Sequence, residues 1–282
     1  MKRVLRWLRN AVIGVIVFVL TAATVIYVTS EVKLRRSYDA RGMAVAVPAD
    51  SASIAEGERL ARIRGCLGCH RSQLEGGMFV DDPLLGLIAA PNLTTAVRAY
   101  SDAELEGIIR HGVRPDGRSV VAMPSDMFRL LDDADLGKIL AYLHSVPELT
   151  GQVRMVKPGP LGRLGIALGK FTPAAVEVRR VELLSDSFPA AGSPVAPGAY
   201  LARTVCTECH GAMLSGFEGE TPDLRIAAGY SPEQFVRLMR TGVALGEREL
   251  ELMSEVARSR FTHFTDEEIA ALYAYLLSRA TH

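Results

Sequence analysis

The sequence lacks an excess of charge of either sign, because its 282 residues carry 32 Lys and Arg against 32 Asp and Glu. Proteins that bind nucleic acid usually present a basic excess, so no nucleic-acid partner is expected. The hydrophobic fraction of 49% and the charged fraction of 23% are ordinary for globular proteins and exclude a wholly disordered chain. At roughly 100–200 residues per domain, the length gives room for about two domains.

The chain also lacks any run in which apolar and polar residues alternate steadily, so a sheet is not indicated. Helix signals are frequent instead. A polar N-cap followed by Pro, or three residues later by Glu, marks the start of a helix, and Gly after the last turn marks its end. These signals predict an all-α fold. The starts are Ser101 with Glu104, Ser231 with Pro232 and Thr265 with Glu268, and the ends are Gly112 and Gly242.

One long charge-free apolar run is present, from Ala11 to Val28. As a helix it would reach ~27 Å, close to the ~30 Å of a bilayer core. The alternative is a cleaved secretory signal, whose apolar core usually has ~7–15 residues, but no clean Ala-x-Ala site follows the run. The prediction is an uncleaved transmembrane anchor over residues 1–32 and a tether over 33–52. Basic residues flank the run on both sides, so charge does not decide its orientation.

Cysteine is scarce, and its four copies fall into two pairs of the pattern Cys-x-x-Cys-His, which is the attachment motif of c-type haem. Two thiols on one helical turn can form thioethers to the two vinyl groups of one porphyrin, and the adjacent His then lies beneath the iron. Two motifs that use every cysteine predict two covalently bound haem c groups. The motifs are "CLGCH" (Cys66, Cys69, His70) and "CTECH" (Cys206, Cys209, His210).

Three other kinds of site compete for these cysteines. A thioredoxin-like redox pair expects a βαβ surround and no systematic His after the second Cys. A zinc site of four cysteines usually separates its pairs by ~15–20 residues, whereas 136 residues lie between Cys69 and Cys206. Two disulfides would be strained at this spacing and would leave both histidines unexplained. The haem interpretation is therefore favoured.

An internal repeat relates the two halves of the chain. The haem motifs lie 140 positions apart, and the loop from the motif to the following proline is nine residues longer in the first copy. A duplicated domain is therefore predicted. The matching segments are "GERLA" from Gly57 with "GAYLA" from Gly198, "APNL" from Ala90 with "TPDL" from Thr221, and "AYSDAELEGIIRHGV" from Ala99 with "GYSPEQFVRLMRTGV" from Gly229.

The repeat sets the domain limits. One domain is expected over residues 53–147 and the other over 196–282, with a linker rich in Pro and Gly over 148–195. An apolar part of this linker, "LGRLGIALGKF" from Leu161, is expected to pack against a domain, with the membrane face as the alternative.

The repeat also distinguishes two methionines in "SVVAMPSDMF". At an offset of 130, Met123 falls on Met253, whereas Met127 falls on an alanine. Iron held by a histidine needs a sixth ligand for pure electron transfer, and methionine in that position raises the reduction potential. Met127 is therefore expected to be a packing residue. The predicted iron ligands are His70 with Met123 and His210 with Met253.

Histidine is the competing sixth ligand. None of the remaining histidines has a histidine counterpart in the other copy, so they are expected at the surface or around the ligands. His111, next to a glycine, is the one that could approach a haem edge. The four residues are His111, His144, His263 and His282.

With these motifs the chain resembles two class I cytochrome c domains. It is similar to the cytochrome c subunits of membrane-bound bacterial alcohol, aldehyde and sugar-acid dehydrogenases, well over residues 55–145 and more loosely over 198–278. Those subunits typically carry three haem domains, whereas this chain has two motifs. The resemblance rests on the first haem motif, Gly76-Gly77, "PNLT" from Pro91, "HGVRPDGR" from His111 and "AMP" from Ala122.

The resemblance implies that both haem domains lie in the periplasm and the N-terminus in the cytoplasm, because bacteria attach haem c outside the cytoplasmic membrane. The expected function is that of an electron carrier, not an enzyme, with no catalytic residues. It would pass single electrons in a respiratory chain from a dehydrogenase to quinone, another cytochrome or a terminal oxidase. The alternative is a haem enzyme of the di-haem peroxidase or thiosulfate-oxidising type, with one iron five-coordinate or differently ligated.

Overall fold

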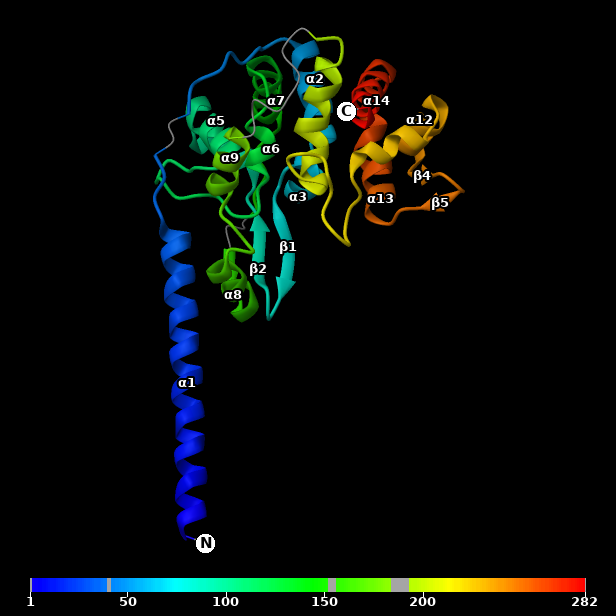
Figure 1. The fold of residues 1–282 in the computed structure, drawn as a ribbon. Coiled ribbons are helices and arrows are strands. Elements are labelled where there is room, and N and C mark those ends of the chain that lie inside the picture. The colour runs from blue at the N-terminus through cyan, green and yellow to red at the C-terminus, as the bar shows by residue number, and fades with distance from the viewer. Residues whose placement is uncertain (1, 40–41, 152–155, 184–192, 282) are drawn as a thin grey trace.

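The structure is a computed structural model that describes residues 2–39, 42–151, 156–183 and 193–281. Its first element, α1 (Lys2–Arg35), is a 34-residue helix that extends away from the rest of the fold (Figure 1). At about 1.5 Å per residue it is about 51 Å long. By length and composition it could cross a membrane, and Ser30 is its one buried residue. The apolar run therefore forms one exposed helix, which continues past residue 32 to Arg35.

The first of two helical units follows α1. Its opening helix, α2, packs against its closing helix, α7, so the ends of the unit meet in the core (Figure 1). The two helices approach closely at Gly57, where a Cβ atom would lie 1.9 Å from the carbonyl oxygen of Lys138. The elements are α2 (Ser51–Ile63), α3 (Cys66–His70), β1 (Gly77–Asp82), β2 (Gly86–Ala90), α4 (Leu93–Ala99), α5 (Asp102–His111), α6 (Ser125–Phe128) and α7 (Asp133–Ser145).

The second unit repeats this plan. Its opening helix α10 packs against its closing helix α14, and at Gly198 a Cβ atom would lie 2.0 Å from the carbonyl oxygen of Ala271. The elements are α10 (Ala196–Leu201), the π-helical turn η2 (Ala202–Cys206), α11 (Thr207–His210), the 3-10 helix η3 (Leu224–Gly229), α12 (Pro232–Thr241), β4 (Val243–Ala244), β5 (Arg248–Glu249), α13 (Leu252–Ser259), the 3-10 helix η4 (Phe261–His263) and α14 (Asp266–Ala280).

The predicted helix ends are confirmed. Ser101 and Thr265 each form a capping box with the Glu three residues later, and Gly112 closes α5 in the left-handed conformation at φ 65°. In the second unit Ser231 caps α12 and Gly242 closes it at φ 76°. The all-α class is confirmed as well.

The expectation of no sheet is wrong at two places. β1 and β2 form an antiparallel hairpin, and β3 (Val156–Pro158) from the linker pairs with β2; β4 and β5 form a second, two-residue pair. The hairpin occupies the longer loop of the first copy, between its haem motif and Pro91. Its strands of six and five residues are too short to show steady alternation, and β2, "GLIAA", has no polar residue to alternate.

The predicted linker carries two helices, α8 (Pro160–Leu168) and α9 (Ala174–Glu182). α9 packs against α6 and α5, and α8 packs against α1, β2 and β3. The expected packing of the apolar linker segment is therefore found for one face of α8, where Gly162 and Ile166 are buried. Leu161 and Leu168 on the same helix are exposed.

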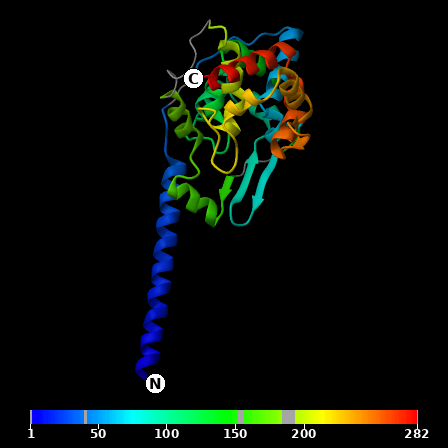
Figure 2. The ribbon, with the colours of Figure 1, turned by 45° about the vertical axis from the view of Figure 1, so that its right-hand side comes forward.

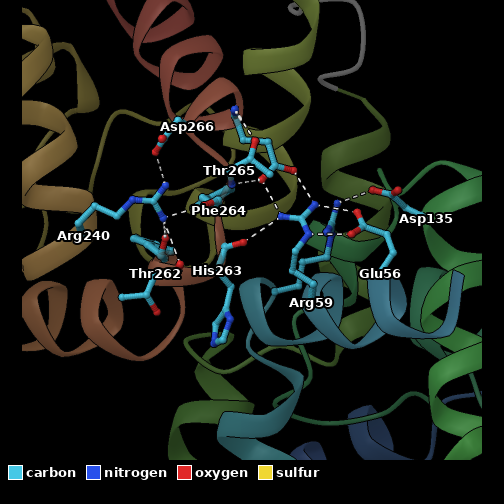
Figure 3. Close-up of polar contacts among 12 residues, drawn as sticks. Glu56, Arg59, Asp135, Arg240, Thr262, His263, Phe264, Thr265 and Asp266 are labelled. Carbon is cyan, nitrogen blue, oxygen red and sulfur yellow. Dashed lines mark hydrogen bonds and ion pairs between the residues drawn. The ribbon is translucent and has the colours of Figure 1, made fainter. Parts of the chain in front are cut away.

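The two units lie side by side, joined by Arg59 of α2 (Figure 3). Its guanidinium donates to both carboxylate oxygens of Glu268 on α14, at 2.7 and 2.9 Å, and to the carbonyl oxygen of His263 at 2.9 Å. Arg240 orders the segment that Arg59 contacts, because it donates to the carbonyl oxygens of Thr262 and Phe264 at 3.1 and 2.7 Å.

We expect the replacement Arg59→Gln to make the thermal stability of the protein depend less on pH between pH 3 and pH 7. The hydrogen bond from Arg59 lowers the pKa of Glu56, so this carboxylate stabilises the fold above its ordinary pKa of 4.5 and loses that contribution as the pH falls below it. The difference in melting temperature between wild type and variant should be largest at pH 7 and shrink towards pH 3. Thermal unfolding followed by circular dichroism measures it.

Arg62→Gln is the matched control. Arg62 pairs with Glu58 within the same helix at 2.6 Å, and an exposed pair of this kind contributes only ~0.3–0.5 kcal/mol. A difference in melting temperature between wild type and Arg59→Gln that stays constant across the pH range would contradict the role assigned to Glu56.

Candidate functional site

The first predicted haem motif forms a helix of its own. Gly65 lies between α2 and α3 in the left-handed conformation, at φ 77°, which a side chain would strain. The break lets α3 begin at Cys66, and its five residues place both thiols and the imidazole of His70 within little more than one turn.

These three side chains line one cavity of about 720 Å³. Met123 lines the same cavity, so the structure brings together all four residues that the sequence assigns to the first haem. Most of the remaining wall is apolar, which suits a large flat hydrophobic group. The apolar wall residues include Ala90, Leu93, Val97, Leu105, Phe128, Leu131, Ile139 and Leu143.

The orientation of His70 is set by a backbone carbonyl. Its Nδ1 lies 2.8 Å from the carbonyl oxygen of Pro91, and because a carbonyl only accepts, Nδ1 carries the proton and Nε2 keeps a free lone pair. Burial lowers the pKa of His70, which favours this neutral form. Gly76, at φ 77°, allows the approach, since a Cβ atom there would lie 2.6 Å from the backbone of Pro91.

The second motif is held in the same way. η2 leads straight into α11, without the glycine break of the first copy. Nδ1 of His210 lies 2.9 Å from the carbonyl oxygen of Pro222, and Gly216, at φ 77°, again allows the backbone to come close. Burial lowers the pKa of His210 too. Both copies therefore present a neutral imidazole with Nε2 available to a metal.

The methionines differ in burial: Met123 is partly buried beside the core of the first unit. Met127 is 1% exposed and belongs to the core of the first unit, as expected of a packing residue. Met253 is partly buried and packs on the core cluster of the second unit, as does Cys206. Each of Met123 and Met253 closely follows a non-glycine residue at positive φ, Ala122 at 64° and Glu251 at 44°; such strained backbone clusters at ligand sites.

The pKa values and positions of the cysteines disfavour a redox-active pair, disulfides and a zinc site. Burial raises the pKa of Cys66 to about 11 and that of Cys206 to about 12, whereas redox-active Cys-x-x-Cys pairs have a lowered pKa. The four cysteines are not joined in disulfides. Within the described ranges no three or more His, Cys, Asp and Glu residues converge as a metal cluster, so the two pairs do not form one zinc site.

The other histidines take polar partners away from the cavity wall. The imidazole of His144 lies 2.7 Å from Asp102, and that of His111 lies 3.7 Å from Glu106. His263 accepts a hydrogen bond from Arg59 through its backbone carbonyl only. The cavity wall includes none of these three side chains. His282 falls outside the described residues.

Arg64 shows that the cavity fits a group with acidic substituents. Its side chain is 1% exposed and pairs with Asp135 at 2.8 Å, but Nε and Nη1 are buried without a hydrogen-bond partner. Arg64 also lines the cavity. Buried donors left unpaired are costly, and a carboxylate would satisfy them. An apolar cavity with one buried cation fits a haem, which is an apolar ring that carries two carboxylates.

Arg64 and the carbonyl groups of Pro91 and Pro222 are site groups that the sequence pattern does not indicate. The signal for Pro91 and Pro222 was present, because "APNL" and "TPDL" align in the repeat, but the repeat does not say which backbone atom is used. At the offset of 140 between the motifs, Arg64 falls on Thr204, so the repeat could not reveal it.

The two motifs face each other across the boundary between the units. Glu208, between the cysteines of the second motif, lines the cavity of the first. Arg260 donates to Glu208 at 2.9 Å and lies so close to Gly65 that a Cβ atom there would come within 2.3 Å of it. The attachment segments are thus neighbours.

Comparison with known families matches each unit separately. Residues 54–147 match the family described as Cytochrome c. Residues 193–276 match the family described as Cytochrome C oxidase, cbb3-type, subunit III.

Several characterised proteins are similar over most of the chain. The cytochrome c subunit of an alcohol dehydrogenase (quinone) from Gluconacetobacter polyoxogenes is 25% identical over 82% of this chain and 56% of its own length. The gluconate 2-dehydrogenase cytochrome c subunit of Pantoea cypripedii is 27% identical over 82% and 60%, and the fructose dehydrogenase cytochrome subunit of Gluconobacter japonicus is 25% identical over 80% and 52%. The chain spans a little over half the length of these relatives.

Proposed function

Because the chain carries two cytochrome c domains, each of which binds a covalently attached haem c, we propose that it is a membrane-anchored carrier of single electrons for a periplasmic dehydrogenase. The observation that carries the proposal is the duplicated arrangement of a Cys-x-x-Cys-His helix whose histidine is oriented by a proline carbonyl. The names of the relatives, cytochrome c subunits of alcohol, gluconate and fructose dehydrogenases, support a dehydrogenase as the electron donor. Quinone, another cytochrome or a terminal oxidase would be the acceptor.

Each residue of the arrangement has a proposed role. When bound, haem c supplies a reversible one-electron couple of its iron. Cys66 and Cys69 hold one group covalently, and Cys206 and Cys209 hold the other. Nε2 of His70 and of His210 would bind the irons, fixed in direction by the bonds of Nδ1 to the prolines.

The sixth ligands are proposed to be Met123 and Met253. With a histidine and a methionine bound to each iron, neither iron would keep a vacant site for a substrate, which argues against a peroxidase or thiosulfate-oxidising enzyme. Arg64 is proposed to meet a carboxylate of the first haem.

The neighbouring motifs support electron exchange between the domains. Glu208 belongs to the second attachment segment and also to the wall of the first cavity, so little protein separates the two sites. The domain limits proposed from the repeat, 53–147 and 196–282, place one site in each.

The membrane arrangement is also proposed. α1 would be a single-pass anchor of the cytoplasmic membrane, with its N-terminus in the cytoplasm and both haem domains in the periplasm. Support comes from its length, its apolar composition and the exposure of its side chains.

Removing one pair of cysteines should halve the haem content. In Cys206→Ala/Cys209→Ala the second domain has no thiol to form a thioether, so the expected result is one covalent haem per chain instead of two. A pyridine haemochrome assay against protein concentration, combined with mass measurement of the denatured chain, counts them. Cys66→Ala/Cys69→Ala is the matched variant of the other domain and should also leave one; two haems remaining in either variant would contradict the assignment.

A further inference from the structure

We infer that the chain has a second contact with the lipid bilayer, made by an apolar patch beside the C-terminal end of α1. The patch consists of Leu84 and Leu85 at the tip of the β1–β2 hairpin, Leu161 and Leu168 of α8, and Phe171. This inference rests on the proposed role of α1 as an uncleaved anchor, and it adds a surface that the anchor does not require.

Hydrogen bonds hold α8 against a defined part of α1, near the C-terminal end of that helix. Nζ of Lys33 donates to the carbonyl oxygens of Ile166 and Ala167, at 3.0 and 2.9 Å, at the C-terminal end of α8, where a cation also suits the helix dipole. Arg163 donates to Ser30 and Glu31 on α1, at 2.9 and 3.0 Å.

The level along α1 at which α8 is attached corresponds to the surface of the bilayer. The guanidinium of Arg163 lies 4.2 Å from the centre of the Tyr27 ring, so α8 meets α1 between residues 27 and 33. The charge-free run ends at Val28, and the polar headgroup region begins where such a run ends.

The side chains of the patch are apolar but exposed to solvent. Leu84 is 55% exposed, Leu168 68% and Phe171 53%. Leu161 and Leu168 are seven positions apart and therefore lie on one face of α8, whereas Gly162 and Ile166 point into the protein and are buried.

The hairpin tip and α8 form one surface. The backbone amide of Gly159 donates to the carbonyl oxygen of Leu85, and that of Leu161 to the carbonyl oxygen of Leu84, both at 2.9 Å. Figures 1 and 2 show the hairpin and α8 protruding from the two units on the side towards the N-terminal end of α1. A bilayer that surrounds α1 up to Val28 therefore reaches the patch.

Lipid is the occupant that the surroundings favour. α8, which carries part of the patch, packs against α1, and exposed Lys157 and Lys170 flank the patch. An apolar surface edged by lysines is typical of segments that lie in the plane of an anionic bilayer. The consequence is orientation: two contacts hold the domains in one rotation about α1 and keep the first cavity, whose wall includes Arg35 and Arg163, near the membrane surface.

Site-directed spin labelling of the full holoprotein tests this surface. All four native cysteines are expected to be in thioethers, so an introduced cysteine is the one free thiol. Leu161→Cys and Leu168→Cys are spin-labelled in nanodiscs of phosphatidylethanolamine and phosphatidylglycerol with the irons oxidised. Relaxation by oxygen, which partitions into lipid, is compared with relaxation by a water-soluble nickel chelate.

Two controls bracket the result. Leu252→Cys on α13 is also exposed, at 61%, but lies in the second unit away from α1 and should give a water-like ratio. Val15→Cys, inside the apolar run from Ala11 to Val28, should give a lipid-like ratio. The labels at Leu161 and Leu168 are expected to shift from the Leu252 value towards the Val15 value.

The outcomes separate this inference from the proposed anchor. A lipid-like ratio at Val15 with water-like ratios at Leu161 and Leu168 overturns the second contact and leaves the anchor. A water-like ratio at Val15 overturns both. Dipolar broadening between labels at Leu168 that disappears on dilution with unlabelled protein would place a second copy of the chain on the patch, which also overturns the lipid contact.

Discussion

Met123→Ala is expected to abolish the low-spin, six-coordinate spectrum of one haem while the other keeps its own. The side chain lines the same cavity as Cys66, Cys69 and His70, and alanine leaves the sixth position to water or to nothing. Axial ligands tune haem potentials over ~0.8 V, and methionine lies at the high end. The midpoint potential of that haem should therefore fall by a sizeable part of this range. Absorption spectroscopy during a potentiometric titration measures both changes.

Met253→Ala should do the same to the second haem, and the two variants together should leave no methionine-ligated iron. Met127→Leu is the matched control. Met127 is 1% exposed, and a swap that conserves volume usually costs less than ~1.5 kcal/mol, so the ligation and both potentials should stay unchanged. If Met127→Leu changed a spectrum and Met123→Ala did not, the ligand assignment would be reversed.

Gly57→Ala is expected to destabilise the first domain strongly. The added Cβ atom would lie 1.9 Å from the carbonyl oxygen of Lys138, which is backbone of a packed helix and cannot rotate away. Either α2 and α7 separate or one of them bends, and overpacking of this kind typically costs ~1–3 kcal/mol or more. Chemical denaturation followed by far-ultraviolet circular dichroism gives the free energy of unfolding.

Two further glycines calibrate this experiment. Gly198→Ala repeats the change at the equivalent crossing of the second domain and should have a similar effect. Gly229→Ala is the control, because no atom lies within 4 Å of its added Cβ, and a compatible Gly→Ala change is neutral or stabilising by ~0.4–1 kcal/mol. Equal losses at Gly57 and Gly229 would show that chain flexibility, and not the helix crossing, sets the effect.

Much of the molecule was predictable because the chain is duplicated. The haem motifs and the capped helices each appear twice, and a pattern seen twice separates a meaningful signal from a chance one. The pairing of Met123 with Met253 rests on the same repeat and stays a prediction. The long N-terminal helix was predictable from its charge-free apolar run, and its role as a membrane anchor stays a prediction.

Features that occur in only one of the two repeats were not predictable from the sequence. The β1–β2 hairpin has no counterpart in the second domain, and its third strand comes from a linker whose composition suggested no regular structure. Arg64 is likewise unique to one copy, and its burial depends on Asp135 and Tyr200, which lie 71 and 136 positions away in the chain. Such long-range contacts leave no local pattern to detect.

In both domains the helix that opens the unit packs on the helix that closes it. α2 ends at Ile63 and α7 begins at Asp133, so the first core cannot close until about seventy intervening residues have been synthesised. The Cys-x-x-Cys-His segment lies between these two helices, so we expect its thiols to be accessible until α7 packs on α2. This topology would allow haem attachment before the last helix closes the unit.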